Sequence, residues 1–269
     1  MSDRMPRRML GVVLGLGLLC APAASGALIT FDSSADLGNF VENGGGAPSI
    51  YSWTNADGVG TPAGAITHSN GSNADNSRSL LYTGETYAIA DGPLTVSVML
   101  KLDAGSNEGS ASNFSRNFVG FASSTNVNLA TQDGKLGVRL FKPANSLNWV
   151  FHLQSGTSTF EVGKSPLEDD HWYEMIVTIT QTAANKFNIA GKLLDHGTDG
   201  QAADPQVLYD GSQEFTNATM AAASQWYAGL LGQLHFGGAT HFDNLSIVPE
   251  PTSALGLAMA GMLLIRRRA

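Results

Sequence analysis

A strict alternation of apolar and polar residues is the feature that most constrains the fold of this chain. From Leu94 to Leu102 every second residue is aliphatic, and Thr95, Ser97 and Lys101 lie among the residues between them. A period of two places successive side chains on opposite faces of a strand, so one face of this segment packs against a core. A helix would instead need apolar residues three and four positions apart.

Similar short segments recur along the chain and are separated by turn-forming residues. Further strands are predicted at Ala27–Phe31, Ser79–Thr83, Asn117–Ala122, Lys135–Phe141, Asn148–Leu153, Trp172–Thr180, Phe187–Leu194, Leu231–Phe236 and Thr240–Val248. The turn signals between them are Asp91-Gly92-Pro93, Gln132-Asp133-Gly134, Asp199-Gly200, Asp210-Gly211 and Gly237-Gly238. This pattern predicts an all-β, antiparallel sandwich. Within it, only Glu214–Gln225 is predicted as a helix, and residues 43–76, rich in Gly, Asn and Ser, are predicted as long loops.

Two segments add a resemblance to a known fold. His171-Trp-Tyr-Glu-Met-Ile-Val-Thr-Ile-Thr opens an apolar alternation on a tryptophan, and His241-Phe-Asp-Asn-Leu-Ser-Ile-Val places an aspartate before alternating apolar residues. Both are similar to strands of laminin-G-like and concanavalin-like domains. The resemblance implies a jelly roll of two packed sheets, a fold used for carbohydrate binding and by some glycosidases.

The N-terminus has the pattern of a secretory signal peptide. Three arginines precede an apolar run from Met9 to Cys20, and small residues follow that run. We therefore predict that residues 1–27 form a signal peptide with a helical apolar segment. Cleavage after Gly26 and cleavage after Ala27 both satisfy the requirement for small residues.

The C-terminus combines three features in a fixed order. Pro249-Glu250-Pro251 precedes a run from Ala254 to Ile265 that is wholly apolar or glycine, and Arg266-Arg267-Arg268 follows. Together they resemble the PEP-CTERM sorting signal. The resemblance implies that a membrane-embedded exosortase recognises residues 249–269, cleaves near the tripeptide, and releases or re-attaches the protein at the cell surface.

The physical properties of the tail agree with transient insertion into the inner membrane. Its apolar run is shorter than the roughly 20 residues that an upright membrane helix needs. The two prolines block a helix upstream of the run, and the arginines behind it favour a cytoplasmic C-terminus. A permanent anchor without processing is the alternative.

Between these signals, residues 28–248 are long enough for one large β domain. Cys20 is the only cysteine in the chain and lies in the signal peptide, so the domain has no disulfide. Removing Asp3 and the six arginines of the two termini from the 23 acidic and 15 basic residues leaves a net charge of about −13. Such a charge argues against nucleic acid as a partner.

The sequence lacks the usual signatures of hydrolases. Glycoside hydrolysis requires two carboxylates across the substrate, and the Glu-x-Asp-x-x-Glu spacing of jelly-roll glucanases is absent. Glu168-Asp169-Asp170 follows Ser165-Pro166 and is predicted to be an exposed turn. Neither Gly-x-Ser-x-Gly nor His-Glu-x-x-His occurs. We therefore predict a non-enzymatic protein, with a divergent glycosidase as an alternative.

Aromatic side chains are the candidates for carbohydrate binding, because sugar rings stack on exposed aromatic faces. The candidate residues are Tyr51, Trp53, Trp149 and Trp226, with Tyr227 beside the last, and a position in the core is the alternative for each of them. Tyr51 and Trp53 are of most interest, since they fall in the glycine-rich region.

Asp32 and Asp243 are the candidate metal ligands. First and last strands are often neighbours in jelly rolls, and related carbohydrate-binding modules hold a structural Ca²⁺ between them. Asp32 follows the predicted first strand and Asp243 lies in the predicted last one, so their oxygens could share the ion with backbone carbonyls. A zinc site formed by His235, His241 and Asp243 around the Gly237-Gly238 turn is an alternative.

Taken together, these features predict an exported, exosortase-sorted protein of the cell surface or extracellular matrix. Its expected partners are the secretion machinery, the exosortase, the membrane during transit, and exopolysaccharide. A structural matrix protein, a lectin-like carbohydrate-binding module and a glycosidase remain open, and they differ in whether a sheet face carries aromatic residues, paired acids or neither.

Overall fold

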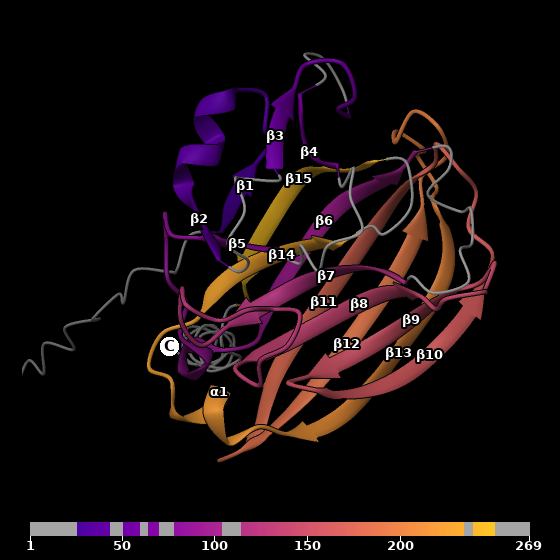
Figure 1. Cartoon of the computed structure of the whole chain (residues 1–269). Coiled ribbons are helices and arrows are strands. Elements are labelled where there is room, and N and C mark those ends of the chain that lie inside the picture. Colours follow the sequence, from indigo (N-terminus) through magenta and orange to yellow (C-terminus); the bar gives the residue numbers. More distant parts are fainter. Residues whose placement is uncertain are drawn as a thin grey trace, which may run out of the picture.

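The computed structural model describes residues 26–43, 51–59, 64–69, 78–103, 114–233 and 239–250. These residues form two antiparallel β-sheets packed face to face (Figure 1). The prediction of an all-β antiparallel sandwich is thereby confirmed. The predicted signal helix and the predicted C-terminal hydrophobic helix lie outside the described residues.

Sheet A contains eight strands. Seven of them follow one another across the sheet in the order β13 (Gln206–Thr216), β12 (Lys186–Asp195), β11 (Trp172–Ala183), β6 (Leu94–Leu102), β15 (Ala239–Pro249), β4 (Ala65–Ser69) and β3 (Tyr51–Thr54). The eighth strand, β1 (Ala27–Ile29), pairs antiparallel with β15. The first and last strands are therefore neighbours, as predicted.

Sheet B contains seven strands, and in Figure 1 its strands β7 to β10 lie across β11 to β13 of sheet A. Their order is β10 (Ser158–Ser165), β9 (Trp149–Ser155), β8 (Lys135–Lys142), β7 (Ser115–Ala122), β14 (Tyr227–Gln233), β5 (Arg78–Tyr82) and β2 (Phe40–Asn43). The helices in the described ranges are short: two 3-10 helices, Ser34–Asn39 and Ile89–Asp91, and α1 (Ala218–Ala222).

The hydrophobic core lies between the two sheets. Sheet A contributes the alternate residues of β6, and Val96, Val98 and Leu100 have no exposed surface. Sheet B contributes large side chains such as Trp149 and Trp226, which also have no exposed surface. Because alternate residues of each strand enter this core, the residues between them form the outer faces of the sandwich.

The predicted helix Glu214–Gln225 is wrong over most of its length. Its first residues, Glu214 to Thr216, belong to β13 and pair with β12. The helix that does form, α1, starts after Asn217, whose side-chain oxygen accepts a hydrogen bond from the N–H of Met220 at 2.9 Å. Pairing along the sheet edge therefore outweighs the helical preference of the first residues.

The prediction that residues 43–76 form only loops is also wrong. Two of the strands of sheet A, β3 and β4, lie in this region and pair with each other. Ala65 and Ile66 are fully buried in β4, and β4 also pairs with β15. Burial of these few apolar residues stabilises strands that the Gly- and Asn-rich composition conceals.

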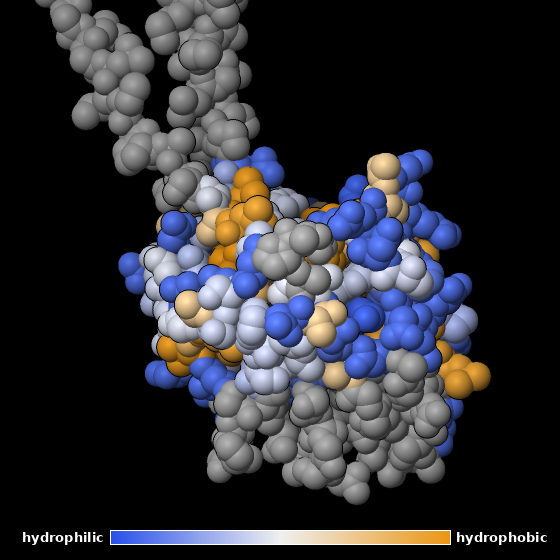
Figure 2. Space-filling view, turned by 90° about the horizontal axis from the view of Figure 1, so that it is seen from above, coloured by the Kyte–Doolittle hydropathy of each residue, from blue (hydrophilic) through white to orange (hydrophobic). Residues whose placement is uncertain are grey.

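The described surface has no broad apolar face. Its exposed large apolar side chains are Leu28, Val41, Leu147, Phe160, Val207 and Val248, which come from different parts of the fold. Seen from above, hydrophilic residues cover most of the coloured surface, and hydrophobic residues form separate patches (Figure 2). Isolated exposed apolar residues are ordinary on a folded domain. Within the described ranges, no helix is long and apolar enough to cross a membrane.

Candidate functional site

The outer face of sheet B carries a group of basic and aromatic side chains on neighbouring strands. We call this group the basic platform, and it consists of Phe114, Arg116, Lys135, Arg139, Phe141, His152 and Gln233. Antiparallel pairing brings them together: Arg116 of β7 lies opposite both Gln233 of β14 and Phe141 of β8, and Arg139 lies opposite His152 of β9. These positions alternate with core residues, so they face away from the sandwich interior.

Arg116 is held at the β14 side of the platform. Its Nε donates a hydrogen bond to Oε1 of Gln233, and its Nη1 donates to the carbonyl oxygen of Ala130 at 3.1 Å. Its guanidinium carbon lies 5.3 Å from the ring centroid of Phe114. A guanidinium over an aromatic ring gains cation–π attraction and keeps its orientation. Arg116 is half-buried and therefore partly accessible to solvent.

Arg139 occupies the centre of the platform. Its guanidinium carbon lies 4.7 Å from the ring centroid of Phe141, and its Nη2 lies 3.4 Å from Nδ1 of His152. Because arginine only donates, Nδ1 of His152 is the acceptor. Burial and then the charge of Arg139 lower the pKa of His152 to about 4, so the imidazole is neutral at physiological pH. Phe141 also packs against Phe114, with ring centroids 5.7 Å apart.

Lys135 adds a buried positive charge next to the two arginines. The residue has no exposed surface, and its Nζ has no hydrogen-bond partner. Burial and, to a smaller extent, the charges of Arg116 and Arg139 lower the pKa of Lys135 to about 8, while the charge of Asp133 opposes the shift. Burial and the charge of Arg116 also lower the pKa of Arg139 to about 10. The three cations are therefore close enough to repel one another.

The connection between β7 and β8 folds back over part of this face. Val127, Leu129 and Ala130 of the connection pack against outer-face residues that include Phe118 and Leu231. The N–H of Leu129 also donates to Oγ of Ser79 at 2.7 Å. The connection screens one side of the platform from solvent and leaves Phe141 and His152 half-exposed.

Three of the four aromatic residues proposed as sugar platforms are core residues. Trp149 and Trp226 have no exposed surface, and Tyr51 is 6% exposed. Their polar groups bond inside the protein: Nε1 of Trp226 donates to the carbonyl of Met220 at 3.1 Å, and the Tyr51 hydroxyl donates to the carbonyl of Arg78 at 2.6 Å. Their prediction as exposed stacking surfaces is wrong, because the space between two sheets of this size is filled by large side chains.

The fourth residue, Trp53, is half-buried on β3. Its Nε1 donates to the carbonyl of Phe31 at 2.7 Å, which ties β3 to the end of β1. Tyr227 is also half-exposed; it is the first residue of β14 and pairs with Ala122 of β7. Neither lies within the basic platform.

The structure places Asp243 in the interior and Asp32 at the surface. Asp243 is 1% exposed, and its carboxylate accepts hydrogen bonds from the N–H groups of Val59 at 2.7 Å and Asn244 at 2.6 Å. Burial raises the pKa of Asp243 to about 7; the bonds from Val59 and Asn244 oppose this shift, and the charge of Asp32 contributes to it. Asp32 is exposed and accepts a hydrogen bond from Thr30 at 2.7 Å.

The described residues contain no group of three or more His, Cys, Asp and Glu side chains that could hold a metal ion. Of the alternative zinc ligands, His235 lies outside the described residues. His241 bonds on both sides, to Asp103 at 2.8 Å and to Thr67 at 2.9 Å. This arrangement ties β15 to β4 and to the end of β6.

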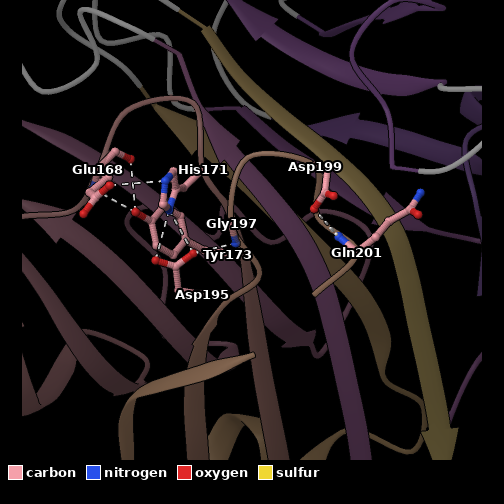
Figure 3. A network of polar contacts seen from close by, with 7 residues as sticks. All are labelled: Glu168, His171, Tyr173, Asp195, Gly197, Asp199 and Gln201. Atoms are coloured by element: carbon pink, nitrogen blue, oxygen red, sulfur yellow. Dashed lines mark hydrogen bonds and ion pairs between the residues drawn. The ribbon is translucent and has the colours of Figure 1, made fainter. Parts of the chain in front are cut away.

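A second polar cluster lies where β11 begins and β12 ends (Figure 3). Nδ1 of His171 lies 3.0 Å from Asp195, and its Nε2 lies 3.2 Å from Glu168. The Tyr173 hydroxyl bonds both the N–H and the carbonyl of Glu168, at 2.8 and 3.0 Å. These bonds fasten the turn at residues 168–170, whose exposure is as predicted. The cluster is a connection between neighbouring loops.

A hollow of about 200 Å³ lies between the start of α1 and the β9–β10 turn. Its lining is made of small and hydroxyl-bearing residues, and Asp133 is its one charged residue. It offers neither an aromatic face nor a group of charges. The basic platform is therefore the stronger candidate site.

Pro249 and Glu250, the first two residues of the predicted sorting signal, lie at the end of β15. Pro249 is the last residue of β15 and lies opposite Leu94, and the N–H of Glu250 donates to the carbonyl of Pro93 at 2.8 Å. Glu250 is exposed. Pro251 and Arg266, Arg267 and Arg268 lie outside the described residues.

The solved structures that resemble this chain are distant from it in sequence. No protein-family model matches it, and no curated protein matches it. A carbohydrate esterase from bacteriophage phi24B is 11% identical, with a TM-score of 0.49 over 82% of this chain and 95% of the esterase. An alginate lyase from a Chlorella virus is 7% identical, with a TM-score of 0.49 over 83% of this chain and 99% of the lyase.

A protein of unknown function with a galectin-like fold from Bacillus subtilis is 10% identical, with a TM-score of 0.46 over 83% of this chain and 94% of that protein. Likeness at this level concerns the arrangement of strands and carries no inference about activity. The function must therefore be argued from the side chains of this chain itself.

Proposed function

We propose that this protein is an exported, non-enzymatic protein of the cell surface or extracellular matrix whose jelly-roll domain binds carbohydrate on the basic platform. The observation that carries the proposal is the pair of half-exposed phenylalanines, Phe114 and Phe141, held on an outer sheet face by stacked guanidinium groups. A structural matrix protein would need no such arrangement.

The platform has the composition of a carbohydrate site. Aromatic rings offer apolar faces against which the C–H side of a sugar ring can pack. The neutral, half-exposed imidazole of His152 combines a hydrogen-bond donor and an acceptor, which suit sugar hydroxyls, while the buried Gln233 orients Arg116. Arg139 and Arg116 supply further donors at positions fixed by stacking. A few placed polar groups around an apolar surface are typical of small-molecule and glycan sites.

The same face favours binding over glycoside hydrolysis. Hydrolysis of a glycosidic bond needs a pair of carboxyl groups across the substrate. The strands β7, β8, β9 and β14 contain no Asp or Glu at all. Glu161 of β10, opposite His152, is a single exposed carboxylate at the border of the platform.

Export and sorting remain proposals that rest on the two termini. The signal-peptide pattern directs the chain across the inner membrane, and the C-terminal features direct it to an exosortase. In support, β15, the last strand in the described ranges, ends at Pro249, the first residue of the tripeptide, and Glu250 is exposed.

A structural Ca²⁺ at the seam of β1 and β15 is a further part of the proposal. The chemistry of the residues fits: Asp243 is a buried carboxylate whose described partners are two backbone N–H groups, and Asp32 lies near enough to raise its pKa. Ca²⁺ takes oxygen ligands, so both carboxylates and nearby carbonyls would hold it. The ion would balance two negative charges that otherwise repel each other.

Carbohydrate binding is tested by comparing two phenylalanine variants. Affinity electrophoresis through gels containing bacterial exopolysaccharides should retard the wild-type protein, and Phe141→Ala should lose most of that retardation. Phe160→Ala is the matched control, because Phe160 lies on β10, is 42% exposed and is outside the platform. Equal retardation of both variants, or release of reducing sugars by the wild type, would overturn the proposal.

A further inference from the structure

The charge on sheet B differs in sign from that of the chain. The whole chain carries a formal net charge of −8. The four strands β7, β8, β9 and β14 nevertheless contain no acidic residue, and their outer face carries Arg116, Lys135 and Arg139. A local field of one sign, opposite to the protein's net charge, concentrates ligands of the other sign.

Two of these cations have no acidic partner in the described parts of the chain. None of the ion pairs among the described residues involves Lys135 or Arg139. Nζ of Lys135 and Nε of Arg139 are buried and without a hydrogen-bond partner. Burying a charge without a partner is costly, and a bound anion would offset that cost for Lys135.

We infer that the basic platform binds a polysaccharide that carries carboxylate groups, with the half-exposed Arg116 and Arg139 contacting the carboxylate above the buried ammonium of Lys135. This inference rests on the proposed carbohydrate-binding function and names the class of glycan. The planar guanidinium matches the two oxygens of a carboxylate, which makes arginine the favoured residue for this recognition. Lys135 acts through its charge, since its fully buried side chain does not reach the surface.

The spacing of charged and aromatic groups also suits a uronate sugar. The ring of Phe141 lies against the guanidinium of Arg139, so a sugar stacked beside Phe141 brings its substituents near the cation. Gln233 is fully buried, and its bond with Arg116 holds that guanidinium in place on the neighbouring side. Other polyanions, such as sulfated glycans and single-stranded DNA, offer negative charge without this combination of ring and carboxylate.

The experiment compares four polymers of similar length by titration calorimetry at low ionic strength. They are polygalacturonate, its fully methyl-esterified form, a sulfated galactan and single-stranded DNA. The expected result is binding to polygalacturonate that weakens as salt is added, with at least tenfold weaker binding to the ester. Esterification removes the charge and leaves the sugar backbone, so it isolates the carboxylate.

Two variants test whether the carboxylate of the polymer binds on the basic platform. Arg139→Gln should weaken binding of polygalacturonate about tenfold or more, since hydrogen bonds to charged groups are among the stronger ones. Lys192→Gln is the charge-matched control, because Lys192 is on β12 of sheet A, 51% exposed and paired with Asp210. Thermal melts of both variants must match the wild type, and the salt dependence of the wild type gives a second test that needs no variant.

The outcomes separate this inference from the proposed function. Equal binding of the esterified polymer would overturn the carboxylate while leaving carbohydrate binding in place. Tighter binding of the sulfated galactan or of DNA would overturn it in favour of general polyanion recognition. Absence of binding to any glycan would overturn both the inference and the proposed function.

Discussion

Replacement of Lys135 by methionine tests the buried charge on which the platform depends. Burial and two neighbouring arginines lower the pKa of Lys135 from 10.5 to about 8. Each pKa unit corresponds to about 1.4 kcal/mol between protonation states. Keeping the ammonium charged at neutral pH therefore costs the folded state up to about 3 kcal/mol, or about 2 kcal/mol once solvent screening is allowed for. Met has a similar length and no charge, so Lys135→Met should be more stable by this amount.

The sign of the pH dependence provides the decisive part of this test. A lysine with a lowered folded pKa destabilises the protein fully below about pH 8, and the penalty disappears as pH rises toward the unfolded pKa of 10.5. Urea unfolding of both proteins at about pH 7, 8.5 and 10 should show a difference in free energy of unfolding that shrinks with pH. A difference that is absent at pH 7, or that stays constant, would refute the account of Lys135. The same variant should bind polygalacturonate more weakly, although it is more stable.

The remaining predictions concern the calcium seam, the sheets and the two termini. The pKa of Asp243 is raised from 3.8 to about 7, so its carboxyl ionises in the unfolded state at lower pH than in the folded state, and the melting temperature in EDTA should fall as pH rises from about 4 to 7. Added Ca²⁺ should restore the melting temperature at neutral pH, and Asp243→Asn should remove both effects. A melting temperature that Ca²⁺ leaves unchanged would exclude the site. A methyl group at Gly120 would lie 2.2 Å from a carbonyl oxygen of the neighbouring strand, so Gly120→Ala should cost more than about 2 kcal/mol in urea unfolding. Gly38→Ala meets nothing within 4 Å and is its control, so similar losses in the two would contradict the packing. Intact-mass analysis of exported protein should find Ala27 as the first residue, since Ala27 pairs with Ile247 in β1, and should find Arg266–Arg268 absent; a chain retaining those arginines would disprove cleavage.

Strands with one buried face were predictable from sequence, and edge strands were not. The predicted and observed limits of β6 coincide, because Leu94–Leu102 alternates between the core and the outer face. By contrast, β13 and β10 lie at the sheet edges and are mostly exposed, so burial imposes no alternation on them. Asp210-Gly211, predicted as a turn, lies inside β13, where Gly211 pairs with Gly191.

The candidate site was less predictable because it depends on register between distant strands. Trp149 and Trp226, predicted as exposed stacking surfaces, lie in the core, whereas Phe141, which was not predicted, lies on the outer face of sheet B. Large aromatic residues serve equally well in a core and on a surface, and sequence alone does not distinguish these uses. Arg116 and Gln233 are far apart in sequence and meet only through the pairing of β7 with β14. One signal was available in the sequence: the segments that form β7, β8, β9 and β14 contain no Asp or Glu, although the chain as a whole is acidic.

The position of a bound oligosaccharide tests the central claim most directly. A crystal structure of the domain with a short oligogalacturonate should show a sugar ring against Phe141 and its carboxylate bonded to the guanidinium of Arg139 or Arg116. Such a complex would establish the outer face of sheet B as the binding surface. A sugar bound on the outer face of sheet A, or at the hollow beside α1, with the basic platform left empty, would contradict the account.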